Sequence, residues 1–193
     1  MTDIGRPQND DSAGRVAYQG APGAFSHEAC LVLRPWDDAV GFETFAEAID
    51  AVRSGDCDCA LIPVENSTIG AVEPAATLVA ASGLFQVGEV WRRIGLHLMA
   101  VPGATLTGIR SVESHPVALK QCAETLARLG LTPVVVFDTA GAARDVSLAN
   151  DLSRAALAPA GAAEVYGLSI LRNDLQDSAE NRTRFVLLSR RSA

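Results

Sequence analysis

A hydroxyl between two guanidinium groups stands near the end of this 193-residue sequence. Thr183 lies between Arg182 and Arg184, just before the apolar stretch 185–188. A hydroxyl can donate a hydrogen bond, and arginine can bind carboxylates or phosphates through two parallel bonds. This chemistry suits a small anionic ligand, whereas the simpler interpretation is a strand with a polar start.

Four further polar groups precede or occupy expected helices: Glu65-Asn66-Ser67, Ser114-His115, Gln121 and Thr139. On one continuous helix, Ser114 and Gln121 would share a face, roughly 10 Å apart along the axis. Each group also has a structural interpretation: Ser114 as a helix N-cap, Gln121 as solvated surface, Asn66-Ser67 as turn residues. No single group indicates a site by itself.

The elements that must position these groups follow one repeated pattern: an apolar run, a turn rich in small or hydroxyl residues, then a helix rich in alanine and leucine. The spacing predicts helices from the turn at 20–26 through Leu33 and at 45–53, 116–129, 140–149 and 161–166, and strands at 15–19, 59–64, 134–137, 155–158 and 185–189. Gly130 is expected to end the longest helix in the left-handed conformation. Strands that alternate with helices indicate an α/β protein with parallel sheets.

In such sheets the turns that follow the strands meet at the carboxyl edge. The turns at 20–26, 65–72, 114–116 and 138–140 would each present backbone N–H groups at the start of a helix. Helix N-termini attract anions, so these turns favour a small anionic ligand. The sequence contains neither a GxxxxGK[ST] loop nor a GxGxxG motif, so a nucleotide site is not predicted.

Composition narrows the class of protein further. The net charge is −7, which disfavours nucleic acid and anionic membrane as partners. No apolar stretch is long enough to span a bilayer, and the first 14 residues predict a disordered tail rather than a targeting segment. We therefore expect a soluble protein.

The four cysteines contain no CxxC pair. Cys57-Asp58-Cys59 resembles half of a metal site, but no second pair or nearby histidine completes it, so strand alternation is the favoured interpretation. Free thiols without a signal peptide suit a reducing cytoplasm.

Six sequence blocks carry a resemblance to a known family: VAYQGAPGAFS, ALIPVENSTIGAV, SHPVALKQC, FDTAGAA, YGLSILRNDLQD and NRTRFVLLS. In order and spacing they resemble the catalytic domain of prephenate dehydratases, from about Arg15 to Ser189. The resemblance implies an α/β fold of two lobes, like the type II periplasmic binding proteins, with the active site in the cleft between the lobes. It implies a tail over 1–14, a first lobe over 15–92 and 172–193, and a second lobe over 93–171.

The resemblance also implies roles for residues. Thr183 falls on the family's threonine that assists departure of the ring hydroxyl, and the other implied catalytic residues are Asn66, Ser114 and Gln121. The residues expected to bind substrate are Gly23, Ser26, Glu65, Ser67, His115, Thr139, Arg184 and Phe185. The position of His115 at the start of a helix disfavours its charged form, so we expect it to support the site rather than act as an acid. Val117 departs from the glutamine common in the family.

The implied activity is a lyase reaction in phenylalanine biosynthesis: prephenate, a dianion, loses water and carbon dioxide to give phenylpyruvate. Neither a metal nor an organic cofactor is implied, and the family suggests a homodimer or homotetramer. Its members usually continue into a regulatory ACT domain, whereas this chain stops where that domain would begin, so we expect no feedback inhibition through it. Two alternatives stay open: arogenate dehydratase, and a binding module without catalysis.

Overall fold

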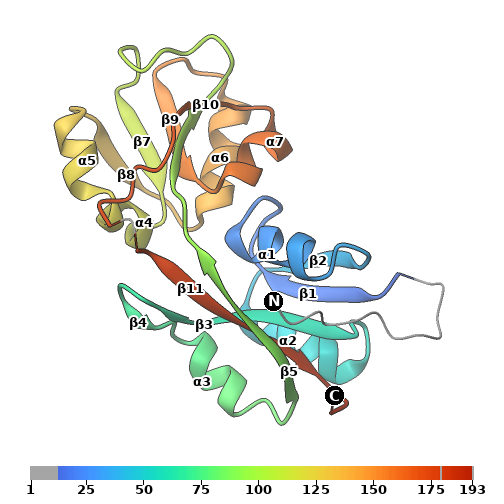
Figure 1. The fold of residues 1–193 in the computed structure, drawn as a ribbon. Helices are drawn as coiled ribbons and strands as arrows, with labels where there is room; N and C mark the ends of the chain where they lie inside the picture. Colours follow the sequence, from blue (N-terminus) through green and yellow to red (C-terminus); the bar gives the residue numbers. More distant parts are fainter. Residues whose placement is uncertain (1–12, 179, 193) are drawn as a thin grey trace. The chain divides into compact units, whose positions relative to one another are not determined.

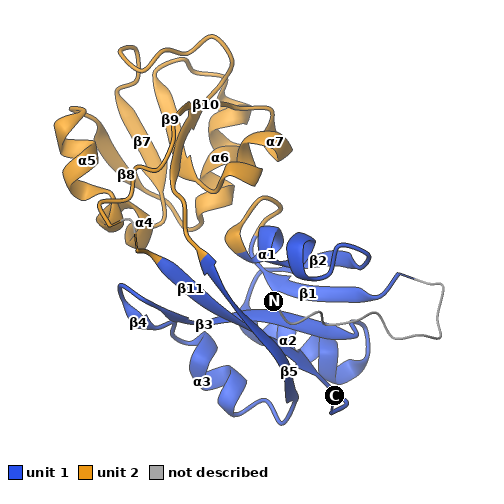
Figure 2. Cartoon of the chain, viewed as in Figure 1, with its two compact units in different colours: residues 1–20, 26–92, 182–193 blue, residues 21–25, 93–181 orange. Residues whose placement is uncertain are grey.

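The computed structural model describes residues 13–178 and 180–192. Positions 1–12 of the predicted disordered tail lie outside the described residues. Contacts divide the described chain into two compact units (Figure 2). Unit 1 is drawn from residues 1–20, 26–92 and 182–193, and unit 2 from residues 21–25 and 93–181. No described helix has the length and apolar character needed to cross a membrane.

Unit 1 is built on one sheet in the order β2-β1-β3-β11-β5, with β4 paired to β3 (Figure 1). Its strands are β1 (Arg15–Gln19), β2 (Asp38–Phe42), β3 (Cys59–Asn66), β4 (Gly70–Ala71), β5 (Phe85–Arg93) and β11 (Arg182–Ser189). Its helices are α1 (Phe25–Leu33), α2 (Phe45–Ser54) and α3 (Ala75–Ala80). The predicted strands at 15–19, 59–64 and 185–189 are therefore confirmed.

Local sequence explains the best-defined helix of unit 1. Thr44 caps α2 by accepting a hydrogen bond from the Glu47 N–H, while the Glu47 carboxylate accepts one from the Thr44 N–H. Gly55 ends the helix with φ 94°, a conformation that glycine adopts without steric cost. Ile49 and Val52 then pack into the core against the strands.

Unit 2 is built on a sheet in the order β10-β6-β9-β7-β8. Its strands are β6 (His97–Ala100), β7 (Ser111–Ser114), β8 (Thr132–Val135), β9 (Arg154–Ala158) and β10 (Ser169–Arg172). Its helices are α4 (Pro116–Gln121), α5 (Ala123–Arg128), α6 (Thr139–Ala149) and α7 (Ala160–Tyr166). Alternate residues of β9 enter different core clusters: Ala155 and Leu157 pack with residues of α4 and α5, Ala156 and Ala158 with those of α6 and α7. The sheet is thus covered on both faces.

The two sheets share one strand order. In unit 1, β1 pairs in parallel with β2 and β3, and β3 pairs antiparallel with β11. In unit 2, β7 pairs in parallel with β8 and β9, and β9 pairs antiparallel with β6. Two α/β units with the same strand order confirm the predicted α/β class. They agree with the fold of type II periplasmic binding proteins.

The single helix expected over 116–129 is wrong, because the chain breaks at Cys122 into α4 and α5. A carboxylate distant in sequence starts the second helix: Asp177 accepts hydrogen bonds from the backbone N–H groups of Glu124 and Thr125. Gly130, just after α5, has φ 66°, which confirms the prediction that this residue adopts the left-handed conformation at the end of the helix.

The boundaries of the units also differ from the predicted lobes at 21–25 and at 172–181, two stretches that belong to unit 2. β10 pairs with β6, and the Leu175 N–H donates to the Leu96 carbonyl at 2.7 Å. The Leu96 N–H in turn donates to the Gln176 side-chain oxygen. These bonds hold the segment on the second sheet until β11 begins.

Candidate active site

Asn66 and Thr183 form a buried pair in unit 1, at the end of β3 and near the start of β11. They are register partners across the antiparallel strands, and the Asn66 side-chain nitrogen donates to the Thr183 hydroxyl oxygen at 2.9 Å. Only 5% of Asn66 and 7% of Thr183 is exposed. The structure therefore brings together two of the four predicted catalytic residues.

The turn between β3 and β4 fixes the orientation of the Asn66 amide. Its Oδ1 accepts hydrogen bonds from the backbone N–H groups of Thr68 and Ile69, at 2.9 and 3.2 Å. Because Oδ1 must face these donors, Nδ2 must face Thr183. The Thr183 oxygen is then an acceptor toward Asn66, and its proton is directed elsewhere. Within residues 13–178 and 180–192, no acceptor takes that proton.

Ser67 holds the ends of the same two strands together. Its N–H donates to the Arg182 carbonyl at 2.8 Å, and its hydroxyl oxygen accepts from the Arg182 N–H at 2.9 Å. This reciprocal pair positions Thr183, the next residue of β11. Ser67 thus lies beside the Asn66–Thr183 pair, and its contact with substrate stays a prediction.

Arg184 does not join this cluster. Successive residues of a strand point to opposite faces, so Arg184 faces away from Thr183. Its guanidinium donates to Glu65 at 3.0 Å and to Glu89 at 3.1 Å. Arg184 and Glu65 therefore lie on the sheet face opposite Thr183, and their contact with substrate stays a prediction.

Two further predicted residues of unit 1 are core residues. Phe185 is 1% exposed and Ser26 of α1 is 6% exposed. Both side chains are therefore packed in the core of unit 1, and their contact with substrate stays a prediction.

In unit 2, Ser114 is the last residue of β7 and is fully buried. Its hydroxyl donates to the Leu157 carbonyl of β9 at 2.6 Å. The expected N-cap role is wrong, because the residue before proline is driven to extended conformations and His115 precedes Pro116. His115, with φ −63° and ψ 144°, is the N-cap of α4, and its Nδ1 accepts from the Val117 N–H at 3.3 Å.

Gln121 ends α4 and is half-buried. Its carbonyl accepts from the Asp177 N–H, while its side-chain amide has no hydrogen-bond partner among the described residues. The expected placement of Ser114 and Gln121 on one helix is wrong, since Ser114 precedes α4. Gln121 therefore offers an unengaged amide, and Ser114 does not offer a free hydroxyl.

Thr139 and Gly23 also belong to unit 2. Thr139 begins α6. In the first turn of this helix, the Asp138 carboxylate accepts hydrogen bonds from the N–H groups of Ala140 and Gly141. Gly23 has φ 85°, and a Cβ there would lie 2.7 Å from the Cα of Ala162. Close packing against Ala162 requires a glycine here, and contact of Gly23 with substrate stays a prediction.

Sequence analysis missed an ion pair directly beside Ser114. Glu113 is nearly buried and accepts two hydrogen bonds from Arg154, at 2.6 and 2.9 Å. The bond to Glu113 raises the pKa of the Arg154 guanidinium. The signal in the sequence was an acidic residue in the stretch SVES, directly before the turn at 114–116.

No cluster of three or more histidine, cysteine, aspartate or glutamate residues that could hold a metal ion occurs in the described part of the chain. Burial raises the pKa of the Cys30, Cys59 and Cys122 thiols to about 12. These thiols are neutral at ordinary pH, and the thiolate is the form that acts as a ligand or nucleophile.

The sequence matches the prephenate dehydratase family over residues 16–193. The chain belongs to that family. It is 43% identical over 178 residues to a bifunctional N-acyl-homoserine lactone acylase/prephenate dehydratase of Komagataeibacter europaeus, which covers 92% of this chain and 63% of the relative. It is 41% identical over 182 residues to arogenate dehydratase/prephenate dehydratase 2 (chloroplastic) of Arabidopsis thaliana, covering 94% of this chain and 48% of the relative.

A solved structure with the same fold is the prephenate dehydratase of Arthrobacter aurescens in complex with L-Phe. The TM-score is 0.85 at 27% identity, over 93% of this chain and 61% of that one. The chain thus spans between about half and two thirds of the length of these prephenate dehydratase relatives.

Proposed function

We propose that this chain catalyses the prephenate dehydratase reaction, converting prephenate to phenylpyruvate with loss of water and carbon dioxide. The observation that carries the proposal is the Asn66–Thr183 pair, whose geometry leaves one hydroxyl proton free to be donated. Membership of the family over nearly the whole chain supports it.

In this reaction the bond from the ring to its carboxylate breaks, and the electron pair enters the ring as carbon dioxide leaves. The ring carbon–oxygen bond breaks in turn, and the departing oxygen takes a proton to become water. Thr183 is a weak acid, so it acts as a positioned hydrogen-bond donor to this oxygen, where negative charge develops. The ring becomes aromatic, which supplies the driving force.

The other predicted catalytic residues divide into two roles. Gln121 binds substrate through its unengaged side-chain amide. Ser114 positions the start of α4 by tying β7 to β9. Arg184 is left out of this mechanism because its side chain lies on the sheet face opposite Thr183.

A second candidate substrate is arogenate, which carries an amino group in place of the keto group of prephenate. The Arabidopsis relative is named for both activities, and this chain is 41% identical to it. Because the leaving groups are the same, Thr183 would serve both reactions.

The test is an assay of the purified chain with prephenate and, separately, with arogenate, following phenylpyruvate and phenylalanine. The ratio of the two kcat/KM values names the preferred substrate. The Komagataeibacter relative is also named as an N-acyl-homoserine lactone acylase, so an N-acyl-homoserine lactone is the third compound to be tested in the assay. A folded chain that turns over neither prephenate nor arogenate contradicts the proposal.

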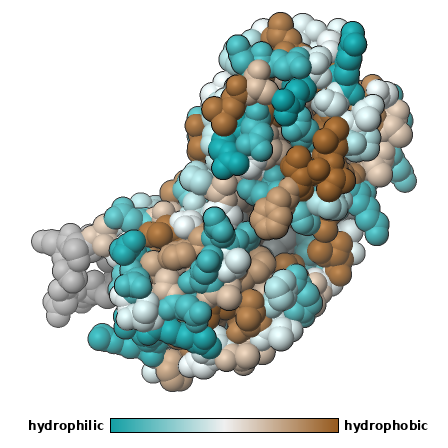
Figure 3. All heavy atoms as spheres, turned by 180° about the vertical axis from the view of Figure 1, so that it is seen from behind, coloured by the Kyte–Doolittle hydropathy of each residue, from teal (hydrophilic) through white to brown (hydrophobic). Residues whose placement is uncertain are grey.

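We also propose that the chain acts as a homodimer or homotetramer. Apolar side chains lie on the surface of unit 2 (Figure 3), and Phe137, just after edge strand β8, is 84% exposed. Burial of such a side chain favours association. Light scattering should give a molecular mass that is a multiple of 20.2 kDa, and Phe137→Ser should lower this mass. Leu148→Ser, which changes another exposed apolar residue of unit 2, should leave the mass unchanged. A monomeric wild-type chain contradicts this proposal.

Cytoplasmic location of the protein remains a prediction.

A further inference from the structure

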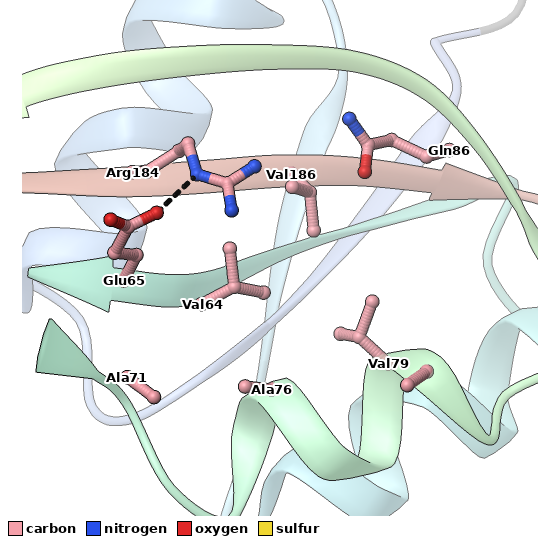
Figure 4. A pocket seen from close by; sticks show the side chains of 9 residues that line it. Val64, Glu65, Ala71, Ala76, Val79, Gln86, Arg184 and Val186 are labelled. Atoms are coloured by element: carbon pink, nitrogen blue, oxygen red, sulfur yellow. Dashed lines mark hydrogen bonds and ion pairs between the residues drawn. The ribbon is translucent and has the colours of Figure 1, made fainter.

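Unit 1 contains a cavity on the sheet face that carries Arg184, away from Thr183. It lies between α3 and strands β3, β11 and β5, and its volume is about 460 Å³ (Figure 4). Sites for small molecules commonly have volumes of about 300–1,000 Å³ and combine apolar walls with a few polar groups. This cavity has both features.

The walls are aliphatic. Val64 of β3 and Val186 of β11 lie on the strand side, and Val79 and Ala76 of α3 point toward them (Figure 4). No aromatic side chain lines the cavity among the described residues. A branched aliphatic group matches such walls in both size and polarity.

The polar lining residues are Glu65, Arg184 and Gln86, and Glu89 adjoins the cavity through its bonds to Arg184 and Gln86. Arg184 donates through Nε to Glu65 and through Nη1 to Glu89, which also accepts from the Gln86 side chain at 3.1 Å. One arginine and two carboxylates leave a net charge of −1. One oxygen of each carboxylate and Nη2 of Arg184 are not used in these bonds, so the cluster can both accept from a cation and donate to an anion.

We propose that this cavity binds a free aliphatic α-amino acid. The ammonium group donates to the unused oxygens of Glu65 and Glu89, and the carboxylate accepts from Nη2 of Arg184. The side chain enters the space between Val64, Val79 and Val186. An aliphatic acid without the ammonium group is repelled by the net negative charge of the cluster. An amine without the carboxylate leaves Nη2 of Arg184 unused, so both groups of the ligand are required.

The test is calorimetric titration of the purified chain with L-leucine. The matched analogues are 4-methylpentanoate, which lacks the ammonium group, and 3-methylbutylamine, which lacks the carboxylate. Each is expected to bind at least about tenfold more weakly, because each loses charge-assisted hydrogen bonds. Absence of saturable L-leucine binding, or equal binding of either analogue, overturns the proposal.

Variants locate the site. Glu89→Gln removes a half-exposed carboxylate and should weaken L-leucine binding about tenfold, whereas Glu43→Gln, an exposed carboxylate elsewhere in unit 1, should leave it unchanged. Val79→Trp should abolish binding by filling the cavity, with far-UV circular dichroism to show that the chain is folded.

Thr183→Ala separates this cavity from the candidate active site, since Thr183 faces the other side of the sheet. It should leave L-leucine binding unchanged. Loss of binding in Thr183→Ala but not in Glu89→Gln places the amino acid at the active site and overturns the proposal. Because calorimetry needs no turnover, the result is independent of whether the chain is a dehydratase.

Discussion

The Asn66 side-chain nitrogen donates to the Thr183 hydroxyl oxygen at 2.9 Å, between residues 117 positions apart in the sequence. Since Asn66 Oδ1 is already bonded to two backbone N–H groups, the direction of this bond is fixed. The direction matters more than the distance, because it leaves Thr183 able to donate.

Replacing Thr183 by alanine removes the proposed donor. We expect kcat to fall about 10²–10³-fold, the typical loss when one donor to developing charge is deleted. Thr183→Ser keeps the hydroxyl and should retain most of the rate. Steady-state kinetics on both variants checks this, and a Thr183→Ala enzyme with the wild-type rate contradicts the mechanism.

Asn66→Asp tests the direction of the bond with almost no change in shape. A carboxylate still accepts from the Thr68 and Ile69 N–H groups, but it also accepts from the Thr183 hydroxyl and so consumes the proton. We expect kcat to drop while thermal unfolding remains near that of the wild type. Equal rates for the two proteins would show that Thr183 does not need its proton.

Ser114 and Gln121 should separate into a stability effect and a binding effect. Ser114→Ala removes the donor to the buried Leu157 carbonyl and should lower the free energy of unfolding by about 1–3 kcal/mol. Gln121→Ala removes no bond of the side chain within the described structure, so it should raise KM with little loss of stability. Urea unfolding and steady-state kinetics measure both variants, and the reverse pattern contradicts these roles.

Gly23 is predicted to tolerate no side chain. Gly23→Ala adds a Cβ that meets the Ala162 backbone at 2.7 Å and places it at φ 85°, where L residues are strained. We expect a loss of about 1–3 kcal/mol in the free energy of unfolding. Gly83→Ala, also at positive φ but with nothing near its Cβ, is the matched control for strain alone and should cost less.

The buried cysteines predict a loss of stability in alkali. Burial raises the pKa of the Cys30 and Cys59 thiols from the ordinary 9.0 to about 12, so between these values the unfolded chain loses protons that the folded chain keeps. Stability from this source is complete below pH 9.0 and falls as pH rises toward 12. Urea unfolding at several pH values above 9.0 should show a shallower decline in Cys30→Ala than in the wild type; an identical decline contradicts the assignment.

The α/β class, several strands and the ends of several helices follow from local sequence, because periodicity, caps and glycines act within a few residues. The break at Cys122 does not, since its cause is Asp177, which contacts Thr125 from 52 positions away. Long-range hydrogen bonds of this kind have no local signature.

One error near the site could have been avoided from the sequence. Pro116 already required an extended His115, which excludes Ser114 from the helix. Thr183 and Arg184 are consecutive in a strand, so the sequence also indicates that their side chains lie on opposite faces of the sheet. The Asn66–Thr183 hydrogen bond, in contrast, depends on strand register and on the turn after β3, which sequence alone does not give.

The chain leaves unit 1 at Arg92 and returns to it only at Arg182. During synthesis, unit 2 is therefore nearly complete before β11, which lies between β3 and β5 in the first sheet, has emerged from the ribosome. Until then unit 1 exposes the unpaired edge of β3, a buried strand in the finished protein. The sheet of unit 1 is therefore completed only after β11, the last strand to be translated, has been made. Thr183 is part of that strand.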